Sequence, residues 1–147
     1  MNLDMGCGAK REEGFLATDI AGQPDVRCDI RHLPFKDSAF DAIRCWHVLE
    51  HIERRDLVGV MNEAYRVLKP GGAIDIEMPV FPFWTAMADP THVTFLVPQT
   101  WDYFCNTAKY GEQMELYGIR PWKMLARKRL MDGQIMRVLM EKPEESK

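Results

Sequence analysis

The sequence predicts an α/β domain in which a doubly wound, mostly parallel sheet ends in a C-terminal antiparallel β-hairpin. Three observations support this fold class. Short apolar runs alternate with turn signals along the first two-thirds of the chain, and several of them end in a polar residue. One long amphipathic helical pattern precedes the last of these runs. Near the C-terminus, Asp132-Gly133 separates two strand-like runs, Trp122–Leu130 and Gln134–Met140, and is the strongest hairpin signal in the sequence.

Five short apolar runs are the expected parallel strands of the sheet. They are Met1–Met5, Phe15–Ile20, Val26–Asp29, Phe40–Trp46 and Ala73–Met78. Ligands of open parallel sheets bind outside the carboxyl ends of the strands. We therefore expect the residues that end these runs to converge on a binding site.

A helix is expected between the fourth and fifth runs. Its apolar positions are spaced by three and four residues and lie at Leu57, Val60, Met61, Ala64, Tyr65 and Leu68. Asp56 is a suitable N-cap, and Lys69-Pro70-Gly71-Gly72 ends the helix. Beyond the fifth run, Pro79–Pro98 reads as a long functional loop or lid, and Pro98 opens a short helix.

Length and composition predict a single domain that spans residues 1–147. Hydrophobic residues make up 46% and charged residues 28%, as in ordinary globular proteins. No apolar run approaches the ~20 residues that cross a bilayer. The cysteines form no C-x-x-C pair, which favours a cytoplasmic location. Residues 120–147 are basic overall but carry interleaved acids, so nucleic-acid binding is not favoured.

Two glycines and two acids stand at the ends of the first three expected strands. Gly6 and Gly8 let the backbone approach a ligand closely and donate N–H groups to it. Asp19 is placed to accept both hydroxyls of a ribose, and Asp29 is placed to accept an adenine amino group. Arg11 stands where the dinucleotide fingerprint has its third glycine. This pattern favours a nucleoside site over an NAD site.

Residues 1–104 resemble the class I S-adenosylmethionine (SAM) dependent methyltransferases, and among them the type-11 group. The resemblance rests on the order and spacing of LDMGCG, GFLATDI, CDIRHLPFKDSAFDAIRCWHVLEHI and RVLKPGG. It implies a Rossmann-like, seven-stranded sheet whose last strand is antiparallel. It also implies that SAM is the cofactor and that the chain is a methyltransferase.

The same resemblance implies which residues hold SAM. The methionine end contacts Asp4, Gly6, Cys7 and Gly8, and the ribose contacts Asp19 with Ile20 beside it. The adenine contacts Asp29, Ile30 and Leu33. The floor of the site near the sulfonium is formed by Trp46 and His47. His92 and His47 are candidate catalytic bases, because histidine titrates near neutral pH. For His92, a role in holding the loop by a hydrogen bond is an equal alternative.

One departure from the family pattern concerns the first crossover. Only 11 residues separate Gly8 from Asp19, against the ~20 expected where a full helix crosses between these strands. The first crossover helix is therefore expected to be shortened or missing. Lys10 or Arg11 could then pair with the SAM carboxylate in its place. A homodimer or a partner subunit could cover the stripped sheet face.

The segment from His47 to His51 also matches H-x-x-E-H, a zinc-peptidase pattern. It follows a strand directly and no third ligand is evident from the sequence, so we predict no metal here. A nearby set of aromatic residues lines either an acceptor pocket or the core; its members are Phe81, Phe83, Trp84, Trp101, Tyr103 and Phe104.

The favoured function is methyl transfer from SAM to a small-molecule, sugar or lipid acceptor. The alternative is a SAM-binding module without catalysis of its own, which partners an active subunit. A zinc peptidase is the third and least favoured reading.

Overall fold

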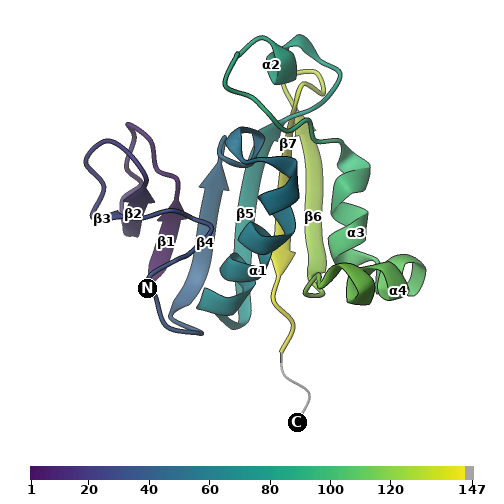
Figure 1. Ribbon diagram of the computed structural model, residues 1–147, viewed down its shortest axis with the longest axis horizontal. Helices are drawn as coiled ribbons and strands as arrows, with labels where there is room; N and C mark the ends of the chain where they lie inside the picture. Colours follow the sequence, from purple (N-terminus) through teal and green to yellow (C-terminus); the bar gives the residue numbers. More distant parts are fainter. Residues whose placement is uncertain (145–147) are drawn as a thin grey trace.

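The computed structural model describes residues 1–144 and contains a seven-stranded sheet in the order β3-β2-β1-β4-β5-β7-β6 (Figure 1). The strands are β1 (Asn2–Met5), β2 (Phe15–Asp19), β3 (Val26–Arg27), β4 (Phe40–Trp46), β5 (Leu68–Pro79), β6 (Lys123–Leu130) and β7 (Ile135–Glu141). All pairs among β1 to β5 are parallel, whereas β7 is antiparallel to both β5 and β6. The predicted fold class and the C-terminal hairpin are confirmed.

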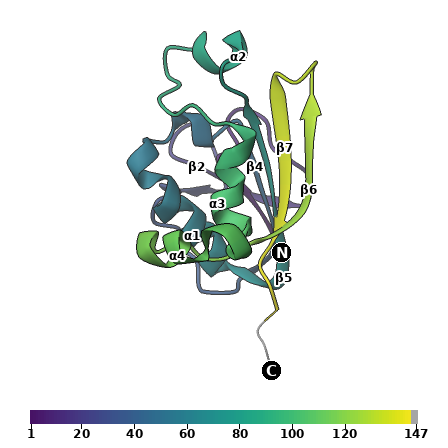
Figure 2. The same ribbon diagram turned by 90° about the vertical axis from the view of Figure 1, so that its right-hand side faces the viewer.

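The helices lie on one face of this sheet. Helix α1 (Leu57–Val67), α3 (Asp102–Cys105) and α4 (Thr107–Tyr117) stand together on the same side in Figure 2. Alternate residues of the strands point into the core beneath them, as the period of two in a strand requires. Ile43, Cys45, Ile74 and Ile76 are accordingly buried. No helix of residues 1–144 is long and apolar enough to cross a membrane.

The opposite face of the sheet has no covering helix within residues 1–144 (Figure 2). It carries the charged side chains of Arg44, Asp75 and Arg137. Two guanidinium groups contact the Trp46 ring, with the Cζ atoms of Arg44 and Arg137 at 4.2 and 4.6 Å from its centroid. Arg137 donates to Asp75 over 2.8 Å, and Arg44 lies 3.6 Å from a carboxylate oxygen of Asp4. We call this surface the helix-free face. Its paired charges and cation–π contacts suit a face that has no apolar layer above it.

The first crossover, from β1 to β2, contains no helix, which confirms the expectation from its length. The connections from β2 to β3 and from β3 to β4 are loops as well. Helix α1 is thus the one α-helix that connects neighbouring strands within β1 to β5. This explains why one layer of helices is missing.

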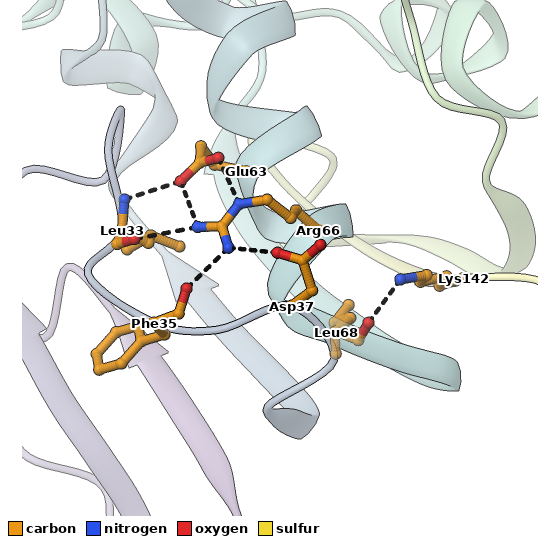
Figure 3. A network of polar contacts seen from close by, with 7 residues as sticks. All are labelled: Leu33, Phe35, Asp37, Glu63, Arg66, Leu68 and Lys142. Carbon is orange, nitrogen blue, oxygen red and sulfur yellow. Dashed lines mark hydrogen bonds and ion pairs between the residues drawn. The ribbon is translucent and has the colours of Figure 1, made fainter.

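Helix α1 anchors the loop between β3 and β4 through Arg66 (Figure 3). Its guanidinium donates to the Glu63 carboxylate at 2.8 and 2.9 Å and to the carbonyls of Leu33 and Phe35 at 3.0 and 2.7 Å. Glu63 in turn accepts the Leu33 N–H at 2.9 Å. These bonds lower the pKa of Glu63, chiefly through the Arg66 hydrogen bonds. The loop that leads from β3 to β4 is therefore held to the helix.

Two local expectations for helix α1 need correction. Asp56 occupies the N-cap position, but its side chain makes no capping hydrogen bond. Its carboxylate lies instead 3.3 Å from the Arg31 guanidinium. The helix ends at Val67, because Leu68 already has extended backbone and begins β5.

The remaining elements follow β4 and β5. Two short 3-10 helices, η1 (Leu49–His51) and η2 (Arg54–Asp56), precede α1, and a third, η3 (Pro98–Trp101), precedes α3. The expected loop between Pro79 and Pro98 contains one short helix, α2 (Trp84–Met87). Helix α4 was not predicted; Asn106 caps its start, and Gly118 ends it with a φ of 69°.

Candidate cofactor-binding and active site

A pocket of about 440 Å³ opens at the carboxyl ends of the parallel strands, the upper edge of the sheet in Figure 1. Its walls come from the ends of β1, β2 and β4, from the loop after β3, and from the η1 and η2 segments. The lining residues are Gly6, Gly8, Asp19, Ile20, Cys28, Asp29, Ile30, Arg31, His47, Val48, His51, Ile52, Glu53 and Asp56. Seven of these were expected from the sequence: Gly6, Gly8, Asp19, Ile20, Asp29, Ile30 and His47.

The glycine loop after β1 is fixed by its neighbours. Gly6 has a φ of +83°, and a Cβ at this position would lie 2.5 Å from Cγ2 of Val48. Its N–H donates to the Thr18 carbonyl at 2.9 Å. Only glycine satisfies both the left-handed backbone and the close approach of Val48.

Asp19 ties this loop to the end of β2. One carboxylate oxygen accepts the Gly8 N–H at 2.8 Å, and the other accepts the Ala21 N–H at 3.0 Å. Each oxygen has two lone pairs, so both can still accept a hydroxyl from the pocket.

The adjoining wall carries an ion-pair chain formed by Asp29, Arg31 and Asp56. The Arg31 side chain donates to both Asp29 oxygens, over distances of 2.7 to 3.1 Å, and reaches Asp56 at 3.3 Å. The Arg31 hydrogen bonds lower the pKa of Asp29. Asp29 is therefore a negatively charged acceptor at neutral pH. The role of Arg31 was missed, since an arginine in a loop gives no distinct sequence signal.

His47 stands at the end of β4 with a positive φ of 55°. Its Nε2 lies 3.0 Å from a Glu77 oxygen, and its Nδ1 lies 3.5 Å from a Glu50 oxygen. Hydrogen bonding to Glu50 raises the pKa of His47, and Glu77 acts in the same direction, against the effect of burial. A non-glycine residue in this region of φ carries backbone strain, which is often found at functional sites.

Four expected residues lie outside the pocket lining: Asp4, Cys7, Leu33 and Trp46. Asp4 is 2% exposed on the helix-free face, where burial raises its pKa. Trp46 lies on that same face because it alternates with the buried Cys45 along β4. Leu33 is buried in the core. The structure thus does not bring Trp46 to the expected floor of the site.

His92 lies in the loop after β5 and does not line the pocket. Its ring packs edge-on against that of His51, with centroids 4.8 Å apart. The H-x-x-E-H segment does not form one helix, since η1 begins at Leu49, after His47. The zinc-peptidase arrangement, with both histidines on one helical turn, is therefore absent from this segment.

The aromatic residues of the C-terminal third divide between core and surface. Trp101 and Phe104 are buried in the core. Trp84 is 67% exposed, and Phe81 stacks on Phe95 at 5.5 Å. The core reading therefore holds for Trp101 and Phe104, whereas an acceptor pocket lined by the exposed members stays a prediction.

The sheet order and the pocket at its carboxyl ends define the class I methyltransferase fold. A solved SAM-dependent methyltransferase from Archaeoglobus fulgidus is similar, with a TM-score of 0.66, 21% identity, and coverage of 96% of this chain and 85% of that one. A methyltransferase from Burkholderia thailandensis, solved with S-adenosylhomocysteine and 1,6-didemethyltoxoflavin, gives a TM-score of 0.66 at 14% identity and covers 97% and 71% of the two chains.

Sequence comparison gives the family. Residues 13–76 match the model of a type-11 methyltransferase domain. The chain is 32% identical over 80 residues to a demethylmenaquinone methyltransferase of Listeria welshimeri, covering 52% of this chain and 33% of the relative. It is 44% identical over 45 residues to the ubiquinone/menaquinone biosynthesis C-methyltransferase of Desulfotalea psychrophila, covering 31% and 18%. Residues 13–76 therefore match the type-11 methyltransferase domain family, and the chain has the fold of the class I SAM-dependent methyltransferases. It spans a third or less of the length of these two relatives.

Proposed function

We propose that the chain binds SAM in the pocket and transfers its methyl group to a small-molecule, sugar or lipid acceptor. One observation carries the proposal: the Gly6–Gly8 loop is hydrogen-bonded to Asp19, and both line one pocket at the carboxyl ends of neighbouring parallel strands. This is the location where open α/β sheets bind nucleotides.

The proposed contacts run along the pocket wall. The Gly6–Gly8 backbone faces the methionine end of SAM, and the Asp19 carboxylate accepts the ribose hydroxyls. Asp29 and Ile30 hold the adenine, with Asp29 kept ionised by Arg31. His47 lies at the end of β4, close to the methyl group to be transferred.

Bound SAM supplies an activated methyl group. The protein orients the acceptor so that one of its lone pairs forms a bond to the methyl carbon while the carbon–sulfur bond breaks and leaves its electron pair on sulfur. Positioning and exclusion of water are then the main contributions of the chain. Two carboxylates raise the pKa of His47, so more of its imidazole is already protonated at neutral pH and unable to accept a proton, which favours a role in positioning.

The test separates binding from turnover. Calorimetric titration of the purified protein with S-adenosylhomocysteine should give one site per chain. A panel of acceptors that bear hydroxyl, amine or activated carbon nucleophiles is then screened for release of S-adenosylhomocysteine from SAM. Absence of binding at millimolar ligand would contradict the proposal.

The helix-free face favours a second candidate, a SAM-binding module that completes a partner subunit. A solved methyltransferase of Haloferax volcanii, similar to this chain with a TM-score of 0.63 at 14% identity, is in complex with the Trm112 methyltransferase activator. A protein that binds S-adenosylhomocysteine tightly, yet turns over no acceptor until a second subunit is added, would support this candidate.

A further inference from the structure

Three potential metal ligands meet beside the pocket. Glu50 and His51 come from η1, and His92 comes from the loop after β5. One ligand atom of each lies within 4.8 Å of those of the other two. An ion bound at ~2.0–2.2 Å holds its ligand atoms roughly 3–4 Å apart, so these side chains need to close by about 1 Å.

Glu50 is the first observation that points to a ligand. Its side chain is 2% exposed, and its Oε2 has no hydrogen-bond partner within the described chain. Its Oε1 lies 3.5 Å from Nδ1 of His47. A buried carboxylate oxygen without a partner is costly, and a bound cation would satisfy it.

The hydrogen bonds of the two imidazoles are the second observation. Nδ1 of His92 lies 2.9 Å from the Ala86 carbonyl, which can only accept. Nδ1 of His51 lies 3.3 Å from the Thr91 carbonyl and 3.1 Å from the Thr91 hydroxyl. That hydroxyl donates its own proton to Asp89 at 2.7 Å, so it too must accept from His51. Both rings therefore carry a proton on Nδ1, and Nε2 is the ring nitrogen left to act as a ligand, as in metal-binding histidines.

The backbone holds the two ligand segments together. The N–H groups of Val93 and Thr94 both donate to the Glu50 carbonyl, at 2.8 and 3.1 Å. Asp89 adds a negative charge, with one oxygen 3.7 Å from Nε2 of His92. The backbone of the two segments is thus held together, the side chains can still adjust, and the negative charge attracts a cation.

We propose that Glu50, His51 and His92 bind a divalent transition-metal ion at the wall of the pocket. Two imidazoles and one carboxylate are a ligand set of zinc and of non-haem iron sites, and such sites leave coordination positions open. His51 lines the pocket, so an ion held by this cluster would lie beside the SAM that is proposed to bind there. The sequence alone predicted no metal because the third ligand, His92, lies 41 positions after His51.

The role of the ion rests on the proposed function and narrows the acceptor to a hydroxyl compound. Coordination to the ion lowers the pKa of the hydroxyl, which then loses its proton to water. The resulting oxygen anion forms the bond to the methyl carbon as the carbon–sulfur bond breaks. No protein base is needed in this case.

The test measures metal binding without turnover. The full chain is treated with a chelator and titrated with Zn²⁺ or Mn²⁺ alone by calorimetry, and its melting temperature is followed. We expect one ion per chain and a rise in melting temperature. Glu50→Gln and His92→Ala should each weaken binding by about 100-fold or more, and Thr91→Val by about 10- to 100-fold.

His32→Ala is the matched control, since His32 is exposed and lies outside the cluster. Each variant is also titrated with S-adenosylhomocysteine, which shows that it is folded and tests the proposed function separately. The proposal is overturned if the parent binds no ion at 100-fold excess over protein, or if folded Glu50→Gln and His92→Ala variants bind it as the parent does.

Discussion

Replacement of Asp19 by alanine should weaken binding of S-adenosylhomocysteine far more than it lowers stability. The carboxylate accepts the N–H groups of Gly8 and Ala21 at 2.8 and 3.0 Å, and in the proposed complex it also accepts two ribose hydroxyls. Hydrogen bonds to a charged group are worth about 1.5–3 kcal/mol each, and two on one carboxylate do not add fully. A loss of about 2–4 kcal/mol corresponds to roughly 30- to 1000-fold in the dissociation constant.

The Asp19→Asn variant keeps the shape of the side chain but removes its charge and one of its two acceptor oxygens, so it separates these effects. Both oxygens of Asp19 face backbone N–H donors, so the amide NH₂ of asparagine would point at one of them. This variant should therefore bind almost as weakly as Asp19→Ala. Glu13→Ala is the control, because Glu13 is an exposed acid in the turn before β2.

The assay is calorimetric titration of the parent and the three variants with S-adenosylhomocysteine, together with a melting curve for each. Melting temperatures should fall by only a few degrees, since the lost bonds lie at the surface. If Asp19→Ala binds within threefold of the parent, the ribose assignment is wrong, and the nucleoside interpretation of the strand ends fails with it.

Four further outcomes are expected. Arg66→Ala should lower the free energy of unfolding in urea by about 2–4 kcal/mol, because it frees the loop after β3 and leaves Glu63 unpaired. The pKa of Glu63 is lowered in the folded state, so its ionised form stabilises the fold above its ordinary pKa of 4.5, and this stabilisation is lost as pH falls through the lowered value. The free energy of unfolding of Glu63→Gln should therefore depend less on pH in the acid range than that of the parent. Gly6→Ala should destabilise through the clash with Val48, and adding Val48→Ala should recover part of the loss in a double-mutant cycle. Cys28 lines the pocket, so saturating S-adenosylhomocysteine should slow its alkylation by iodoacetamide; an unchanged rate would place the ligand elsewhere.

The parallel strands could be predicted because short apolar runs alternate with turn signals, and the hairpin could be predicted because Asp132-Gly133 marks its turn. Helix α4 could not, since Met114 is its one buried residue and no apolar stripe marks it. Its position depends on the capping side chain of Asn106 and on contacts with α3, which a local pattern does not reveal.

Within the site, the strand ends were predictable and the contacts between distant segments were not. Gly6, Gly8, Asp19 and Asp29 follow from the rule that ligands bind at carboxyl ends of parallel strands. The approach of His92 to His51 depends on the path of the loop after β5. Trp46 was assigned to the wrong side of the sheet for the site, because its neighbour Cys45 takes the core side of β4.

The helix-free face has a consequence for how stability depends on temperature. The heat capacity of unfolding grows with the apolar area that unfolding exposes, and it amounts to about 12–15 cal/mol/K per residue in ordinary domains. Here the Arg44–Trp46–Arg137 stack and its neighbours face solvent where an α/β sheet usually buries a second apolar layer. The heat capacity per residue should therefore fall below that range. A smaller heat capacity flattens the stability curve, so this chain should lose stability more gradually on both warming and cooling than a sheet of equal length with helices on both faces.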